Sequence, residues 1–177
     1  MRGLILGRFQ PFHLGHLELV KQVLSECDEI IIAITGSQFN YIEKDPFTAG
    51  ERVEMIHKSL LDAGIKIERC FVVPIQNQET NSLWPAYLKS VLPKFDKIYS
   101  GNEYVEMLLA DSGYDVIKPK FVNRKNYNAT RIRKMIKTND KRWQKLAPKS
   151  VVEIINKIDG VKRLRIISSS DTKPQEF

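Results

Sequence analysis

The residues best suited to chemistry form one stretch near the amino terminus, Gly7-Arg8-Phe9-Gln10-Pro11-Phe12-His13-Leu14-Gly15-His16. His13 and His16 are three positions apart at an expected helix start, so both rings can project to the same side of the first turn. Free backbone N–H groups and the helix dipole favour negative charge at that place. Arg8 adds a cation whose planar donor fork suits phosphate. The stretch therefore predicts a phosphate-binding turn that uses neither a thiol nucleophile nor a metal cage.

For a bare H-x-x-H pair, a chance arrangement on an exposed helix is the simpler interpretation. The surrounding residues favour an anion-binding turn, because Gly7 and Gly15 allow close backbone approach and Pro11 fixes φ. A zinc site needs more ligands, and His57 lies in an expected helix without a partner at ligand spacing. We interpret His57 as a surface or helix-packing residue. The sequence lacks G-x-G-x-x-G after its first strand and lacks G-x-x-x-x-G-K-[ST] throughout, which argues against a Rossmann dehydrogenase and a P-loop NTPase.

A second candidate site is the segment Asn128-Ala129-Thr130-Arg131-Ile132-Arg133. Apolar residues at helical spacing can hold one face of this segment in the core. Thr130 and Arg133 then lie near the positively polarised end of the helix, where phosphate is stabilised. Asn128 is a suitable cap for that helix. A basic helix that simply faces solvent is the alternative.

The stretch from Arg8 to His16 resembles the H-x-G-H signature of the nucleotidyltransferase superfamily related to class I aminoacyl-tRNA synthetases. With the segments described next, it is most similar to the archaeal nicotinamide-mononucleotide adenylyltransferases. The segment at Asn128 resembles the superfamily's S-x-T-x-x-R signature, with Asn128 in place of the usual serine. The resemblance implies catalytic roles for His13, His16 and Arg133. It implies nucleotide binding by Gly7, Arg8, Phe9, Gly15, Gly101, Asn102, Asn128, Thr130 and Ile132.

Two further segments bear on the phosphate acceptor. Trp84 alone is typical of a core aromatic, but Asn81-Ser82-Leu83-Trp84 is similar to the N-x-x-W of the archaeal enzymes. The resemblance implies that Asn81 contacts the nicotinamide carboxamide and that the Trp84 indole lies against the pyridinium ring, a favourable cation–π pair. Lys44 stands where those enzymes more often carry arginine, so it offers the mononucleotide phosphate a point charge rather than a planar donor fork. Arg52 could either steady the fold or help to hold the mononucleotide phosphate.

The implied reaction transfers AMP from ATP to nicotinamide mononucleotide and yields NAD and pyrophosphate, with Mg²⁺ carried by ATP. One alternative changes the acceptor to flavin mononucleotide, phosphopantetheine, or glycerol phosphate with CTP. Another is a nucleic-acid-binding protein, motivated by the basic segment from Arg131 to Lys145, although aromatic residues are sparse among the basic ones and no nucleic-acid-binding signature is present. We therefore expect no nucleic-acid partner. The resemblance also implies a homo-oligomer, with a hexamer as one option.

The predicted elements explain how these segments meet. Strands are expected at about 2–8, 30–34, 67–73, 98–100 and 114–117, and they alternate with helices that end near residues 25, 64, 91 and 112. This alternation predicts an α/β fold with a doubly wound, five-stranded parallel sheet, which the resemblance identifies as the Rossmann-like nucleotidyltransferase fold. Ligands bind such sheets beyond the carboxyl ends of the strands, where the winding reverses. The histidine stretch follows the first strand and should border that crevice.

A helical extension at about 128–160 is expected to pack on the same domain. It contains a helix from Ala129 to Lys137 and another that begins at the capping box Ser150-Val151-Val152-Glu153 and ends at Gly160. A similar box, Thr48-Ala49-Gly50-Glu51, should begin the second helix of the core. The predicted organisation is a single domain over 1–167, with the core sheet at about 1–120, and a frayed tail over 168–177.

Composition agrees with a single globular domain. The 177 residues are 42% hydrophobic and 28% charged, enough for a proper core. A formal net charge of +7 indicates an anionic partner, either nucleic acid or a polyphosphate. Cys27 and Cys70 have neither metal-ligand nor redox spacing, which favours a reducing cytosol. No apolar run reaches membrane-spanning length, and Arg2 and Arg8 interrupt a signal-peptide core, so we expect a soluble cytoplasmic protein without a membrane partner.

Overall fold

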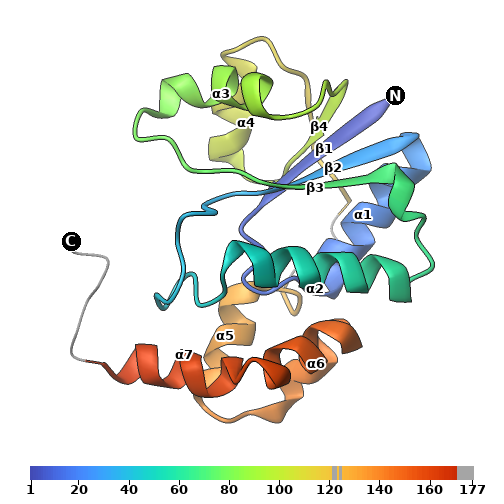
Figure 1. The fold of residues 1–177 in the computed structure, drawn as a ribbon. Helices are drawn as coiled ribbons and strands as arrows, with labels where there is room; N and C mark the ends of the chain where they lie inside the picture. Colours follow the sequence, from blue (N-terminus) through green and yellow to red (C-terminus); the bar gives the residue numbers. More distant parts are fainter. Residues whose placement is uncertain (121–122, 124, 171–177) are drawn as a thin grey trace.

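The computed structural model describes residues 1–120, 123 and 125–170. These residues form a five-stranded sheet of β1 (Arg2–Gly7), β2 (Glu29–Ile34), β3 (Cys70–Pro74), β4 (Lys97–Tyr99) and β5 (Val116–Ile117) (Figure 1). Every pairing is parallel, and the strand order is β3-β2-β1-β4-β5. The winding therefore reverses between β1 and β4. The predicted doubly wound parallel sheet is confirmed.

Alternating side chains of the central strands bury both faces of the sheet. Ile30, Ile32 and Ile34 belong to one apolar cluster, whereas Ile31 and Ala33 belong to the cluster on the other face. Helices α1 (Leu14–Glu26) and α2 (Ala49–Asp62) cover the first face, and α3 (Trp84–Val91) and α4 (Glu103–Ala110) cover the second (Figure 1). The continuous apolar run in β2 thus marks a strand that is covered on both sides.

The C-terminal part adds a helical layer to the first face. It contains α5 (Ala129–Lys137), the 3₁₀ helix η3 (Lys141–Lys145), α6 (Lys149–Lys157) and α7 (Gly160–Ser169). Helix α6 packs on α2 and α7 packs on α5. Their apolar residues join the same core cluster as α1 and α2. The predicted helical extension is therefore part of one packed unit rather than a separate body.

Two predictions within this layer are wrong. Helix α6 is not capped by Ser150, because the helix starts earlier, after Pro148, and the buried Ser150 hydroxyl lies 3.3 Å from that of Ser59 on α2. Gly160 does not end the extension. It begins α7, and a Cβ at Gly160 would lie 3.0 Å from the Ile155 carbonyl oxygen and 3.0 Å from Phe47 Cε1. The glycine serves close packing here, and a helix that the pattern did not predict follows it.

The other boundaries shift by a few residues. One 3₁₀ turn, η1 (Ile67–Arg69), precedes β3, and another, η2 (Asn81–Leu83), precedes α3. The predicted capping box at Thr48 is present, with Thr48 Oγ1 accepting from Glu51 N at 3.2 Å. Helix α7 extends to Ser169, so the predicted tail starts in a helix, and residues 171–177 lie outside the described residues.

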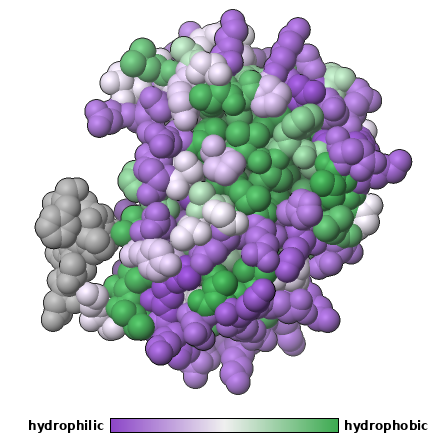
Figure 2. All heavy atoms as spheres, in the orientation of Figure 1, coloured by the Kyte–Doolittle hydropathy of each residue, from purple (hydrophilic) through white to green (hydrophobic). Residues whose placement is uncertain are grey.

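The surface seen in the orientation of Figure 1 is divided by hydropathy. Hydrophobic side chains gather in its upper half, near α3 and the edge strand β3, and hydrophilic ones prevail around the C-terminal helices (Figure 2). Among the described helices, none combines the length and the apolar character needed to cross a membrane.

Candidate functional site

Three cavities meet at the carboxyl end of β1, and Arg8 lines all of them. The Trp84 cavity, of about 360 Å³, is lined by Leu6, Gly7, Arg8, Thr35, Asn77, Gln78, Asn81, Trp84, Ser100, Asn102, Tyr104, Val105 and Leu108. The histidine cavity, of about 430 Å³, is lined by Arg8, Phe9, Gln10, His13, Gly15, His16, Glu18, Leu19, Asn102, Lys120, Tyr127, Asn128, Ala129, Thr130 and Arg133. The lysine cavity, of about 540 Å³, is lined by Arg8, Glu43, Lys44, Thr130, Arg133, Lys134 and Lys137. The three share residues and form one cleft at the point where the sheet winding reverses.

The two histidines form a stacked pair at the start of α1. Their ring centroids are 3.5 Å apart and the rings are inclined by 17°. The Nδ1 atom of His16 accepts a hydrogen bond from the backbone N–H of His13 at 3.2 Å. Phe9 supports the pair edge-on, with its centroid 4.8 Å from that of His16. A neutral His16 whose Nδ1 accepts must carry its proton on Nε2, which leaves that nitrogen as a donor for a ligand.

Burial keeps both rings neutral at pH 7. It lowers the pKa of His13 from 6.5 to about 4. Burial also lowers the pKa of His16 well below 6.5, and the neighbouring His13 lowers it further. The Nδ1 atom of His13 is buried and has no hydrogen-bond partner among the residues that the structure describes. The pair can therefore act through polar N–H groups, while the formal positive charge of the cleft comes from its arginines and lysines.

Arg133 connects the histidine stretch (residues 7–16) with the segment at the start of α5 (residues 128–133). Its Nη1 donates to the carbonyl oxygen of Gln10 at 2.8 Å, and its Nη2 donates to Thr130 Oγ1 at 3.4 Å. The buried Gln10 side chain exchanges two hydrogen bonds with the backbone of Phe47, at 2.9 and 3.0 Å. The start of α5 is thereby fixed to the histidine turn. Gln10 holds this junction together, and sequence reasoning had assigned it no role.

Glycine 15 allows the chain before α5 to approach the histidine turn. A Cβ at Gly15 would lie 2.8 Å from the Cβ of Tyr127 and 3.2 Å from the Cε1 of His13. Asn128 caps α5 as predicted, its Oδ1 accepting from Arg131 N at 3.2 Å. Arg124, four positions before Asn128, lies outside the described residues.

Arg8 and Arg52 differ in what they can reach. The Arg8 side chain is 45% exposed and lies 3.4 Å from the buried carboxylate of Asp45, a neighbour that sequence reasoning did not single out. Arg52 is fully buried and donates to the backbone carbonyls of Thr48, Arg8, Thr35 and Gly36. Among the described residues, Arg52 is absent from the lining of the Trp84, histidine and lysine cavities. Of its two predicted roles, the geometry favours steadying the fold.

The Trp84 cavity gathers amide side chains beside the indole. Asn81 and Trp84 line it as expected, together with Asn77 and Gln78, whose polar loop gave no specific signal in the sequence. Trp84 is partly buried and packs against the apolar cluster of that face, so it is both a packing residue and a cavity wall. Asn102 lies at the junction with the histidine cavity and caps α4, accepting from Tyr104 N at 3.1 Å.

The remaining predicted residues occupy different places. Lys44 lies in the lysine cavity, apart from the lining of the Trp84 cavity. Gly101 lines a neighbouring hollow of about 520 Å³ with Asn102 and Lys118. The side chain of Ile132 is fully buried in the core, so it positions α5 rather than facing a ligand. Gly7 lies against Phe9, since a Cβ there would be 2.9 Å from the ring.

The chain is similar to known proteins over most of its length. Residues 4–135 match the Cytidylyltransferase-like family model. The chain is 45% identical over 177 residues to the nicotinamide-nucleotide adenylyltransferase of Caldivirga maquilingensis, covering 100% of this chain and 99% of that protein. It is 44% identical over 171 residues to the enzyme of the same name from Methanococcus aeolicus, covering 97% of each chain.

The fold also matches a solved structure. This is a bifunctional NMN adenylyltransferase/ADP ribose pyrophosphatase from Francisella tularensis, complexed with AMP and a manganese ion, with a TM-score of 0.76 and 21% identity. The match covers 94% of this chain and 52% of that one, so the chain spans about half of the bifunctional protein. Full-length similarity to the curated relatives places the chain in the nicotinamide-nucleotide adenylyltransferase family.

Proposed function

We propose that the chain transfers the adenylyl group of ATP to nicotinamide mononucleotide, forming NAD and pyrophosphate. The observation that carries the proposal is the meeting of the Trp84 cavity and the histidine cavity at Arg8. The Trp84 cavity is lined by amide side chains and an indole, and the histidine cavity is lined by groups that can bind phosphate. A mononucleotide in the first and ATP in the second would have their phosphates face each other at Arg8.

The reaction needs alignment more than covalent help from the protein. An oxygen of the mononucleotide 5′-phosphate attacks the α-phosphorus of ATP, the bond from that phosphorus to the bridging oxygen of the β-phosphate breaks, and pyrophosphate leaves. His13 and His16 donate from their ring nitrogens to the phosphate oxygens at the reacting centre. Arg133 and Thr130 hold the leaving pyrophosphate, and Arg8 bridges the two substrates. Fixed donors and cations of this kind stabilise the charge that develops in such a transfer.

The acceptor is bound by stacking and by amides. The Trp84 indole lies against the pyridinium ring, a cation–π contact, and Asn81 pairs with the carboxamide. Lys44, in the lysine cavity, attracts phosphate as a point charge. Arg52 contributes to mononucleotide binding indirectly. Its Nη1 donates to the backbone carbonyl oxygen of Arg8 at 2.9 Å and so holds Arg8 in place.

Magnesium enters as part of the substrate MgATP. Mg²⁺ keeps several waters and is commonly bound through substrate phosphates. Within residues 1–120, 123 and 125–170, no three His, Cys, Asp or Glu side chains are grouped so that they could hold a metal ion. The cytoplasmic location and the homo-oligomer are predictions from the sequence.

The proposal is tested by offering the protein several phosphate acceptors and identifying the product of each reaction. The purified chain is incubated with ATP, Mg²⁺ and, separately, nicotinamide mononucleotide, flavin mononucleotide and phosphopantetheine, with glycerol phosphate and CTP in a parallel reaction. We expect NAD and equimolar pyrophosphate from the first mixture alone. His16→Ala should lower turnover by about 100-fold or more, because fixed donors at the developing charge supply effects of that size, whereas the exposed His57→Ala should not. A product from another mixture, or His16→Ala at full rate, would refute the proposal.

A further inference from the structure

The lysine cavity extends the phosphate-binding cleft beyond the two signature segments. Five of its seven lining side chains are basic, namely Arg8, Lys44, Arg133, Lys134 and Lys137. It shares Arg8, Thr130 and Arg133 with the histidine cavity, so the two are continuous. Moving away from the histidines, the lining changes from rings and amides to cations. Such a lining suits the far end of a polyphosphate chain.

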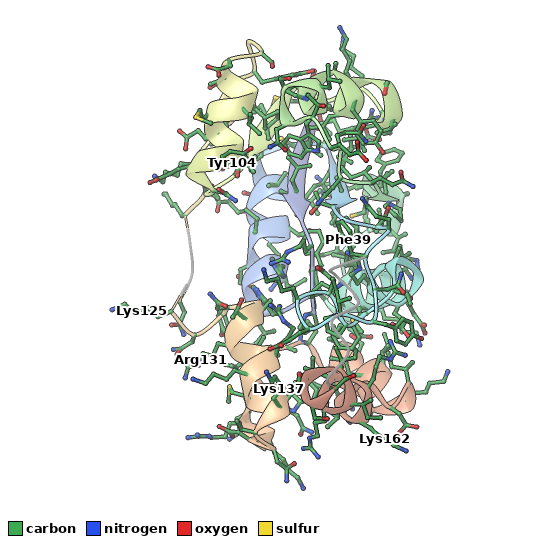
Figure 3. All side chains as sticks on the ribbon, turned by 90° about the vertical axis from the view of Figure 1, so that its left-hand side faces the viewer. Phe39, Tyr104, Lys125, Arg131, Lys137 and Lys162 are labelled. Carbon is green, nitrogen blue, oxygen red and sulfur yellow. The ribbon has the colours of Figure 1, made fainter. Side chains whose placement is uncertain are left out.

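Helix α5 places its side chains along this path. Thr130, Arg133 and Lys137 are spaced three and four residues apart, so they lie on one stripe of the helix. Lys137 is one turn beyond Arg133, about 6 Å along the helix axis at 1.5 Å per residue. Figure 3 shows Lys137 on the inner side of α5, whereas Arg131 points to the outer side. The row of α5 side chains that can bind phosphate thus continues past Arg133 to Lys137.

At the cavity wall, Lys137 forms an ion pair with an acidic side chain. Its Nζ lies 2.5 Å from Oε1 of Glu43, which belongs to the loop between β2 and α2. The two side chains are 33% and 52% exposed. Ion pairs with this much exposure stabilise a fold little, so this one can be exchanged for another partner at small cost. A phosphate chain offers Lys137 more charge and more acceptor oxygens than one carboxylate does.

We propose that Lys137 is a further binding residue for the terminal phosphates of ATP and for the leaving pyrophosphate. Without a polyphosphate, Lys137 is paired with Glu43. The inference rests on the proposed function and adds two residues to its phosphate path. Glu43 repels the polyphosphate and competes for Lys137. Removing the carboxylate should therefore strengthen polyphosphate binding, and removing the ammonium group should weaken it.

Opposite shifts in two variants test this. Lys137→Met should raise the KM for ATP, and that for pyrophosphate in the reverse reaction, by about tenfold, the loss expected for one charge-assisted hydrogen bond. Glu43→Gln should lower the same two constants. The KM for nicotinamide mononucleotide should change in neither variant. Lys149→Met and Glu153→Gln are the matched controls, because they change the same charges in an exposed ion pair on α6 and line none of the cleft cavities.

Calorimetric binding of pyrophosphate to each variant separates this inference from the proposed function, since it needs no turnover. If Lys137→Met binds pyrophosphate like the unmodified chain, or if Glu43→Gln weakens binding as Lys137→Met does, the inference is overturned. The second result would mean that the ion pair only holds the loop in place. Unchanged pyrophosphate affinities would overturn the inference even in a chain that makes NAD. Opposite shifts in a chain that makes no NAD would support the phosphate path and refute the mononucleotide acceptor.

Discussion

The guanidinium of Arg133 donates to the carbonyl oxygen of Gln10 at 2.8 Å, across 123 residues of sequence. This bond fixes the start of α5 to the turn that carries the two histidines. Both groups are buried, with 7% of Arg133 and 1% of Gln10 exposed. The two phosphate-type segments are therefore held at one distance before any ligand binds, which is the preorganisation that a group transfer needs.

Arg133→Met should have two separate effects. The catalytic efficiency with ATP should fall by about 100-fold or more, because the fixed cation that we propose for the leaving group is lost. The free energy of unfolding should fall by about 1–3 kcal/mol, because the buried Gln10 carbonyl loses its partner. Steady-state kinetics and urea unfolding measure the two effects. Arg131→Met is the control, since Arg131 is exposed and lines none of the three cavities. Equal losses in both variants would contradict a specific role for Arg133.

Acid should destabilise the fold through the histidine pair. Between about pH 4 and 6.5 the unfolded chain binds a proton at His13 and the folded chain does not, so the free energy of unfolding falls as pH falls. From about pH 7.5 to 5, the loss from His13 is roughly 2 kcal/mol at 1.36 kcal/mol per pKa unit. The lowered pKa of His16 adds a loss in the same direction.

Urea unfolding at both pH values measures this dependence. His13→Gln, which cannot take up the proton, should show a shallower loss than the unmodified chain. His57→Gln removes an exposed histidine and should leave the dependence unchanged. The same slope in all three proteins would mean that His13 titrates normally in the folded chain.

Gly15→Ala tests the close approach of the histidine turn and the chain before α5. The added methyl group would lie 2.8 Å from Tyr127 Cβ, so one of the two segments must move. We expect activity to fall by about tenfold or more, since small misplacements of a reacting group are costly. Gly50→Ala is the control, because a Cβ there meets nothing within 4 Å. It should keep activity and add up to about 1 kcal/mol to the free energy of unfolding, through better helix propensity.

Trp84→Ala should affect one substrate only. The KM for nicotinamide mononucleotide should rise by about tenfold, the loss expected for a desolvated cation–π contact and its buried area. The KM for ATP should stay within about twofold, since Trp84 lines the Trp84 cavity and is absent from the lining of the histidine cavity. Trp84→Phe keeps an aromatic face and should recover much of the affinity. A parallel rise for both substrates would show that Trp84 only supports the fold.

Local patterns predicted most of the fold because their causes are local. The apolar run in β2, the capping box at Thr48 and the cap at Asn128 all depend on residues within one or two turns. Ser150 and Gly160 were misjudged for the opposite reason. The Ser150 hydroxyl lies against Ser59 on another helix, and Gly160 is required by the nearby Ile155 carbonyl and Phe47 ring. Their surroundings come from distant parts of the chain.

The sequence by itself determined the alternation of strands and helices and the two segments of phosphate-type residues, because both follow from short-range spacing and residue chemistry. Only the tertiary structure decided which arginine can reach a ligand. The Arg8 side chain lines the cleft, whereas the guanidinium of Arg52 donates its hydrogen bonds to backbone carbonyl oxygens inside the fold. It also decided that the imidazoles are neutral and that Glu43 faces Lys137. Which side chains become buried or form ion pairs depends on contacts between segments far apart in the sequence. Local residue spacing does not reveal those contacts.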